Sequence, residues 1–174
     1  MGTRTTANKF SRTPAFCQKG LTLVELVFVM ALFLIIITMV TVLINPTEQI
    51  RKGHDDKRIS DILLLDRVIG EFLLDNKRYP DQSNIIRKSN VLPAGSSDLS
   101  SSNPGWIYEN LSSYTEKLPI DPVNDENYFY SYIHDETGYE ISTKFEYYKD
   151  KMENDNGNDN LLYEVGTNLN LISR

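Results

Sequence analysis

Cysteine and histidine are scarce in this chain of 174 residues, which contains one cysteine, Cys17, and two histidines. No cysteine follows Cys17, so residues 21–174 form no disulfide and must be stabilised by packing or by a bound metal. His54 and His134 are isolated in the sequence, and neither a glycine-rich phosphate loop nor a nucleophile-elbow serine is present. The sequence therefore predicts a protein that is not an enzyme.

Acidic residues are absent from residues 1–20, which contain four basic ones: Arg4, Lys9, Arg12 and Lys19. Without these four charges, the net charge of −6 for the whole chain becomes −10 for residues 21–174. Basic segments tend to stay on the cytoplasmic side of a membrane, which predicts a cytoplasmic N-terminus and an external location for residues 46–174. An acidic external domain has no electrostatic reason to bind nucleic acid directly.

Charge is also absent from residues 26–44, a run of nineteen residues interrupted only by the hydroxyls of Thr38 and Thr41. As a helix this run measures about 28 Å, which is enough to cross the hydrocarbon of a bilayer. A secretory signal core is usually shorter and ends in a small-residue cleavage site, whereas this run ends in Asn45-Pro46. We therefore expect a single membrane anchor that stays attached to the chain.

Glu25 lies just before this uncharged run, where an unpaired carboxylate in hydrocarbon would cost on the order of 2–3 kcal/mol or more. A charge inside a membrane segment indicates a functional site by default. A cut after Gly20 would create a new amino terminus at Leu21, about one helical turn from Glu25. The sequence thus offers a counter-charge for the carboxylate.

The octet Lys19-Gly20-Leu21-Thr22-Leu23-Val24-Glu25-Leu26 resembles the prepilin peptidase site of type IV pilins and type II secretion pseudopilins. The resemblance implies cleavage after Gly20, N-methylation of Leu21 and an assembly role for Glu25, the fifth residue of the mature chain. Leu21 replaces the Phe that is more common there. Two downstream elements, residues 78–80 (Arg-Tyr-Pro) and 118–122 (Leu-Pro-Ile-Asp-Pro), resemble major pseudopilins and their pilin relatives.

The resemblance further implies a structural subunit of a type IV pilus-like or type II secretion pseudopilus filament. Its partners would be the prepilin peptidase, copies of itself, and an inner-membrane assembly platform with its ATPase. The subunit would wait in the inner membrane before joining a periplasmic or extracellular filament. Secretion, motility, adhesion and DNA uptake stay open as filament types, as does the choice between major and minor subunit. The alternative function is a single-pass anchored ectodomain that binds an extracellular ligand and never polymerises.

The expected fold is α+β and pilin-like, with a long N-terminal helix packed on a small C-terminal antiparallel sheet. Residues 1–20 form the leader, 21–45 the transmembrane and polymerisation helix, and 46–78 an amphipathic helix that restarts or kinks at Pro46. Residues 79–120 read as a serine-rich loop with a short helix at 106–118. Residues 121–174 hold the sheet, with a hairpin around 128–145, a strand at 161–165 and an acidic loop.

Two side-chain groups in these segments have competing interpretations. Asp55 and Asp56 look like solvated charge on a helix face rather than a pair of catalytic carboxylates, and His54 beside them looks like a surface residue. Tyr128, Tyr130 and Tyr132 alternate along a predicted strand, and we expect them to pack in the core rather than form an adhesive stripe.

The acidic loop at 153–160, Glu-Asn-Asp-Asn-Gly-Asn-Asp-Asn, is the one segment whose composition suits a metal. Ca²⁺ takes six to eight hard oxygens, which carboxylates and amide carbonyls supply, and Asp155 and Asp159 are the candidate ligands. The loop is no EF-hand, because Met152 stands where that motif requires Asp. Major pseudopilins resemble it in having a C-terminal Ca²⁺ loop. The competing interpretation is a solvated turn without a cofactor, which this composition also favours.

Overall fold

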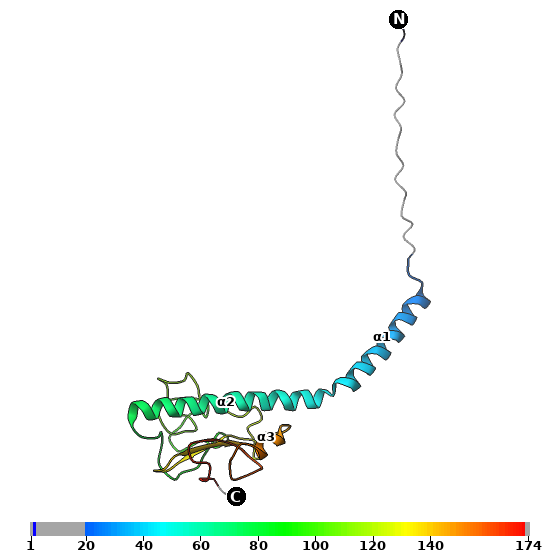
Figure 1. The fold of residues 1–174 in the computed structure, drawn as a ribbon. Coiled ribbons are helices and arrows are strands. Elements are labelled where there is room, and N and C mark those ends of the chain that lie inside the picture. The colour runs from blue at the N-terminus through cyan, green and yellow to red at the C-terminus, as the bar shows by residue number, and fades with distance from the viewer. Residues whose placement is uncertain (1, 3–19, 173–174) are drawn as a thin grey trace. The chain divides into compact units, whose positions relative to one another are not determined.

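The computed structural model describes residue 2 and residues 20–172 (Figure 1). Its contacts divide the chain into two compact units, Met1–Ile44 and Asn45–Arg174. Residues 1, 3–19 and 173–174 lie outside the described part. The predictions made for residues 1 and 3–19 therefore lie outside it too.

The first unit contains one helix, α1 (Leu23–Ile44), which has no buried residue. It is long and apolar enough to cross a membrane, and it is the one such helix among the residues that the structure describes. Its two threonines satisfy their hydroxyls within the helix, because Thr38 Oγ1 donates to Leu34 O and Thr41 Oγ1 donates to Ile37 O at 2.9 and 3.0 Å. An apolar helix can therefore contain them without exposing unpaired hydroxyls to hydrocarbon.

The second unit begins with α2 (Pro46–Asn76), a helix of 31 residues. Asn45 has a left-handed backbone, with φ 46° and ψ 74°, and Pro46 occupies the first turn, where its missing N–H costs no hydrogen bond. The helix ends when Lys77 adopts φ 56° and donates its N–H to Leu73 O at 2.9 Å. The predicted restart at Pro46 is confirmed.

Four short strands form one antiparallel sheet in the order β1-β2-β3-β4. They are β1 (Arg87–Lys88), β2 (Ser131–His134), β3 (Tyr139–Thr143) and β4 (Tyr163–Gly166), and the short helix α3 (Lys149–Glu153) lies between β3 and β4 in the sequence. The predicted hairpin is confirmed as β2 and β3, with Tyr132 opposite Ile141. The predicted third strand is confirmed as β4, with Val165 opposite Ile141 on the other side.

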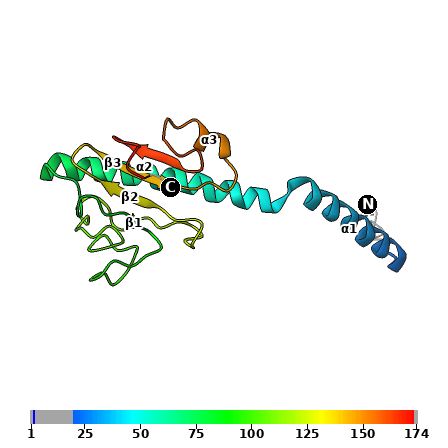
Figure 2. The same ribbon diagram turned by 90° about the horizontal axis from the view of Figure 1, so that it is seen from below.

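The helix α2 crosses one face of this sheet (Figure 2), and the main core lies between them. Tyr130 and Tyr132 are buried in that core with Trp106, so both side chains pack inside rather than form an external stripe. The core also contains the apolar face of α2 and loop residues: Ile62, Leu65, Val68, Ile69, Phe72, Ile107, Leu111 and Leu118. The α+β, pilin-like fold predicted from the sequence is confirmed.

The short helix expected at residues 106–118 is wrong: the described chain forms turns there and no helix. Two of its backbone donors bond to distant carbonyls instead: Leu111 N donates to Ser102 O and Leu118 N donates to Ser100 O, both at 2.8 Å. Trp106 Nε1 also donates to Pro119 O at 2.9 Å. These contacts fold the serine-rich loop back on itself, and only a single turn forms at Leu111, where Tyr114 N and Thr115 N donate to Leu111 O. Two very short elements, β1 and α3, were not predicted from the sequence.

Candidate functional site

The predicted cleavage site is open to solvent where the structure describes it. Gly20 and Leu21 precede α1, Leu21 is 71% exposed, and a Cβ built on Gly20 would meet no atom within 4 Å. A peptidase requires an accessible peptide bond, and this stretch is accessible. Cys17 and the four basic residues of the leader lie outside the described residues.

Glu25 lies in the first turn of α1. Thr22 caps this turn, because Glu25 N donates to Thr22 Oγ1 at 3.2 Å and Leu26 N donates to Thr22 O at 3.1 Å. A carboxylate at this end of a helix interacts favourably with the helix dipole. The sequence has no Lys or Arg between residues 20 and 50. A positively charged partner for Glu25 within this segment would therefore have to be the amine of Leu21, which a cut after Gly20 would create.

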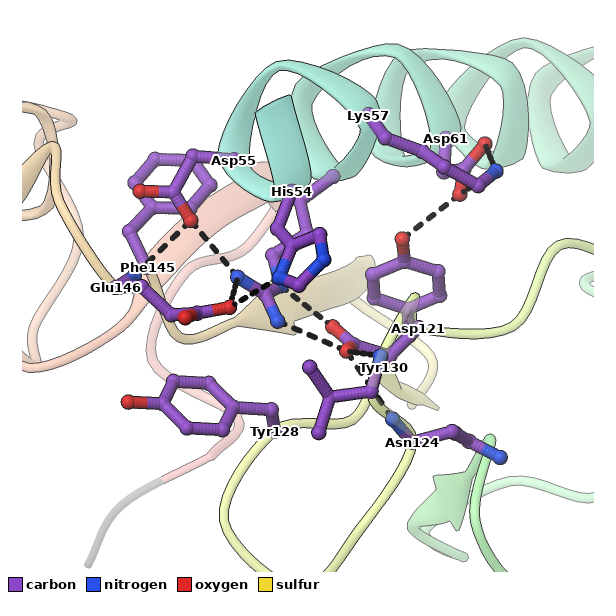
Figure 3. A network of polar contacts seen from close by, with 12 residues as sticks. His54, Asp55, Lys57, Asp61, Asp121, Asn124, Tyr128, Tyr130, Phe145 and Glu146 are labelled. Carbon is purple, nitrogen blue, oxygen red and sulfur yellow. Dashed lines mark hydrogen bonds and ion pairs between the residues drawn. The ribbon is translucent and has the colours of Figure 1, made fainter. Parts of the chain in front are cut away.

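A second concentration of polar chemistry is centred on Arg58, a fully buried residue of α2. Figure 3 labels the carboxylates that surround it, Asp55, Asp121 and Glu146. Its Nε donates to Asp121 Oδ2 at 2.6 Å and its Nη2 to Asp121 Oδ1 at 2.9 Å, which makes a bidentate pair. Its Nη1 donates to Asp55 Oδ1 at 2.8 Å and to Glu146 Oε1 at 2.9 Å. One guanidinium thus binds three carboxylates from three separate segments.

The same carboxylates also bind backbone amides. Asp55 accepts the N–H groups of Glu146, Tyr147 and Tyr148 at 2.9, 2.7 and 3.1 Å. Asp121 Oδ1 accepts the N–H groups of residues 123 and 124 at 2.8 and 3.2 Å. Asp55 therefore fixes the loop after β3 to α2. Asp121 orders the loop before β2 and, through Arg58, fixes that loop to α2.

Burial by itself would lower the pKa of Arg58, but the hydrogen bonds and charge of Asp121, followed by those of Asp55 and Glu146, raise it above its usual value. The guanidinium is therefore charged at every accessible pH. His54 adds to this network from the same helix, with its Nδ1 2.8 Å from Glu146 Oε1. We call Arg58, Asp55, Asp121, Glu146 and His54 the Arg58 cluster.

The interpretation of Asp55 as solvated charge is wrong, because Asp55 is fully buried in this cluster, whereas its neighbour Asp56 is exposed. Each carboxylate of the cluster is hydrogen-bonded to the guanidinium or to backbone amides. Its arrangement holds the loops of the second unit to α2. The role of Arg58 was not predicted from the sequence. The one member of the cluster that the sequence singled out besides Asp55 and His54 was Asp121, which lies within the Leu-Pro-Ile-Asp-Pro element.

The two candidate calcium ligands lie in the loop between α3 and β4 and bind backbone. Asp155 Oδ1 accepts Gly157 N at 2.8 Å and its Oδ2 accepts Glu164 N at 2.7 Å, while Asp159 Oδ1 accepts Leu161 N at 2.9 Å. Within residues 20–172, no group of three or more His, Cys, Asp or Glu side chains is arranged to hold a metal. Ca²⁺ binding at Asp155 and Asp159 stays a prediction.

Comparison with known families finds a match to the model of the prokaryotic N-terminal methylation motif at residues 16–41. The match spans Gly20, Leu21, Glu25 and most of α1. Comparison with curated proteins and with solved structures finds no match for the chain.

The matched segment is a type IV pilin-like precursor motif. It includes most of the apolar helix near the N-terminus and is followed by a domain with an α+β, pilin-like fold. Such a motif is typical of a structural protein anchored by one membrane helix.

Proposed function

We propose that this chain is a structural subunit of a type IV pilus-like or type II secretion pseudopilus filament. The observation that carries the proposal is Glu25: it is the sole charge in α1, and it lies one turn after Leu21 inside the methylation motif. An anchor with no other task gains nothing from a carboxylate at this position. A subunit whose helix must pack against copies of itself gains a polar pairing site.

In this proposal the prepilin peptidase cuts after Gly20 and Leu21 becomes the N-methylated first residue. In the filament, the Glu25 carboxylate pairs with the Leu21 amine of a neighbouring subunit. At an effective dielectric of about 20, two such charges about 4 Å apart attract by roughly 4 kcal/mol, which offsets much of the cost of burying them. The pair would also favour one axial register between neighbouring helices, as buried polar pairs do in other helical assemblies.

The precursor would lie in the inner membrane with its basic leader in the cytoplasm and residues 46–174 outside. From there an inner-membrane platform, driven by a cytoplasmic ATPase, would move it into a filament. The exposed apolar surface of α1 supports this role, because all of its large apolar residues are at least 40% exposed in the single chain. A surface of this kind needs lipid or other helices around it.

The alternative is a single-pass anchored ectodomain that binds an extracellular ligand without polymerising. It would have the same anchor and the same orientation but no use for cleavage at Gly20. Intact-mass and N-terminal peptide spectrometry on the protein from its native membrane separates the two functions. We expect a chain that begins at N-methylated Leu21; a chain that retains residues 1–20 in cells with an active prepilin peptidase would favour the anchored ectodomain.

A further inference from the structure

The positive charge of residues 21–174 is concentrated in two segments. Residues 46–58 are the N-terminal part of α2, and residues 144–151 are the loop after β3 with the start of α3. Together they contain seven of the fourteen basic residues of 21–174 and five acidic ones, a net charge of +2. Because the net charge of 21–174 is −10, the remainder has a net charge of −12. A domain with its charges separated in this way is oriented by a charged surface.

The fold brings these two segments together. Asp55 of α2 accepts the backbone N–H groups of residues 146–148, which fixes the loop to the helix. The Lys52 ammonium lies 4.3 Å from the centre of the Tyr147 ring. Figures 1 and 2 both show α3 next to the N-terminal part of α2, which is drawn in cyan. We call the surface formed by residues 46–58 and 144–151 the basic surface.

The unpaired charge on the basic surface is mostly positive. Four of its basic side chains make no ion pair with any residue that the structure describes: Arg51, Lys144, Lys149 and Lys151. Three of its five acidic side chains already have a basic partner: Glu48, Asp55 and Glu146. The other two, Asp56 and Asp150, are exposed. The basic surface therefore presents four unpaired cations against two unpaired carboxylates.

Apolar and aromatic side chains are exposed among these cations. Ile50 is 59% exposed and Tyr147 is 41% exposed. Tyrosine is enriched where proteins meet the boundary between membrane and water, because its ring is apolar and its hydroxyl is polar. Cations combined with exposed apolar side chains are typical of surfaces that lie on anionic lipid.

The basic surface also follows the membrane helix directly in the chain. The helix α1 ends at Ile44 and α2 begins at Pro46. Because a helix rises 1.5 Å per residue, Lys52 lies about 9 Å along α2 from Pro46. This distance is close to the Debye length, about 8 Å at physiological ionic strength. With α1 in a bilayer, the first cations of α2 are therefore within electrostatic range of the headgroups.

We propose that the basic surface docks on the anionic phospholipid headgroups of the leaflet from which α1 emerges. Its unpaired cations bind lipid phosphates, and Ile50 and Tyr147 enter the interfacial layer. The acidic remainder of the second unit is repelled by the same headgroups and faces away from them. Docking needs the membrane anchor but neither cleavage after Gly20 nor polymerisation. It therefore applies equally to a filament precursor and to an anchored ectodomain.

The test uses the full chain in nanodiscs of phosphatidylcholine, with or without the anionic lipid phosphatidylglycerol. Acetylation by a water-soluble reagent, followed by peptide mass spectrometry, measures the accessibility of each lysine. We expect Lys149 and Lys151 to react several-fold more slowly in the anionic nanodiscs. Lys88 and Lys117, which are exposed and lie outside the basic surface, are internal controls and should react equally in both. At about 1 M salt, where the Debye length is about 3 Å, the protection should largely disappear.

The variant Arg51→Gln tests whether α2 and α3 dock as one surface. Loss of one cation near an anionic membrane should lower the docking equilibrium constant roughly fivefold. Lys149 and Lys151, which lie on the other segment, should therefore become more reactive in the anionic nanodiscs. Lys117→Gln, which removes a cation from outside the basic surface, is the matched control and should leave their protection unchanged.

Equal acetylation of Lys149 and Lys151 in the two kinds of nanodisc would overturn the proposal, whatever the variants do. Protection that is the same with and without anionic lipid and increases with the number of chains per nanodisc would overturn it too. That result would assign the basic surface to contacts with a second copy of the chain. Protection that requires anionic lipid at one chain per nanodisc supports docking on the membrane.

Discussion

Arg58 and Asp121 are 63 residues apart in the sequence and form two parallel hydrogen bonds, at 2.6 and 2.9 Å, with both side chains fully buried. This pair joins α2 to the loop that enters the sheet. Through Asp55 and Glu146, the same guanidinium also binds the loop that leaves β3. The loops on both sides of the hairpin therefore depend on one side chain.

Removing one member of this buried pair should be strongly destabilising. Asp121→Ala leaves the guanidinium with one fewer carboxylate and frees two loop amides, for which we expect a loss of about 3–5 kcal/mol in the free energy of unfolding. Denaturant unfolding of the full chain in detergent measures this loss. Glu71→Ala is the matched control, because it breaks the exposed Arg67–Glu71 pair, which should contribute less than about 1 kcal/mol. Equal losses in the two variants would contradict the role given to Asp121.

Asp81 should make folding sensitive to acid. Its carboxylate binds the Arg87 guanidinium at 2.6 and 2.8 Å and accepts the N–H of Tyr108 at 2.7 Å. Burial opposes its ionisation, but these partners, Arg87 first, lower the pKa of Asp81 below its ordinary value of 3.8. Its stabilising contribution is therefore full above pH 3.8 and is lost as pH falls through the lower folded value.

The variant Asp81→Asn isolates this charge, because Asn also tolerates the left-handed backbone at this position, where φ is 71°. We expect Asp81→Asn to be less stable than the wild type at neutral pH, with a difference that shrinks as the pH falls below about 4. Urea unfolding at a series of pH values measures the difference. A gap that stays constant down to the lowest pH would show that Asp81 contributes through shape alone.

Periodicity made most of the fold predictable, and the exceptions have physical causes. The apolar spacing of α2 and the alternation in β2 and β3 are local patterns, so the helix and the hairpin could be predicted from neighbouring residues. Asp55 and Asp56 are adjacent and chemically identical, yet one is buried and the other exposed. The helical turn places them on different faces, and the partner that makes burial of Asp55 tolerable, Arg58, is itself held by a residue 63 positions away.

The composition of the acidic loop was likewise not enough to predict what its side chains bind. Asn, Asp and Gly suit both a calcium site and a turn, and the structure shows Asp155 and Asp159 bound to backbone amides. It also shows Glu140 and Glu164, whose spacing of 24 residues carries no local signal, brought together by strand pairing. Residues in regular elements are predictable from period, whereas residues joined across the sheet are not.

Calcium binding at Asp155 and Asp159 is testable by thermal unfolding. If both residues are ligands, excess Ca²⁺ should raise the melting temperature of the full chain relative to chelator, because a ligand that binds the folded state alone stabilises it. Asp159→Asn should weaken the shift by removing one charge from the site. Identical melting temperatures with Ca²⁺ and with chelator would leave the loop as a turn without a metal.

Cleavage after Gly20 should depend on the small size of that residue. Gly20→Phe should block the peptidase and leave a precursor that retains residues 1–20, because a bulky side chain would occupy the exposed position next to the scissile bond. Intact-mass spectrometry of the membrane fraction distinguishes the two species. The control is Gly70→Ala in α2, where an added Cβ meets no atom within 4 Å and processing should be unchanged. Normal processing of Gly20→Phe would reject the assigned cleavage site.

Glu25 should be required for assembly and dispensable for membrane insertion. In Glu25→Ala the cost of a carboxylate at the membrane edge disappears, so insertion and cleavage after Gly20 should proceed normally. Filament incorporation should fall sharply, because in the proposed filament the methylated amine of a neighbouring Leu21 loses its counter-charge and would be buried unpaired. Glu25→Gln keeps the size and hydrogen-bonding capacity of the side chain but removes the charge, and it should assemble at an intermediate level at best. Sheared-filament yield, normalised to processed subunit in the membrane, measures the effect. A normal yield from Glu25→Ala would show that apolar packing of α1 alone drives assembly and that the carboxylate has no part in it.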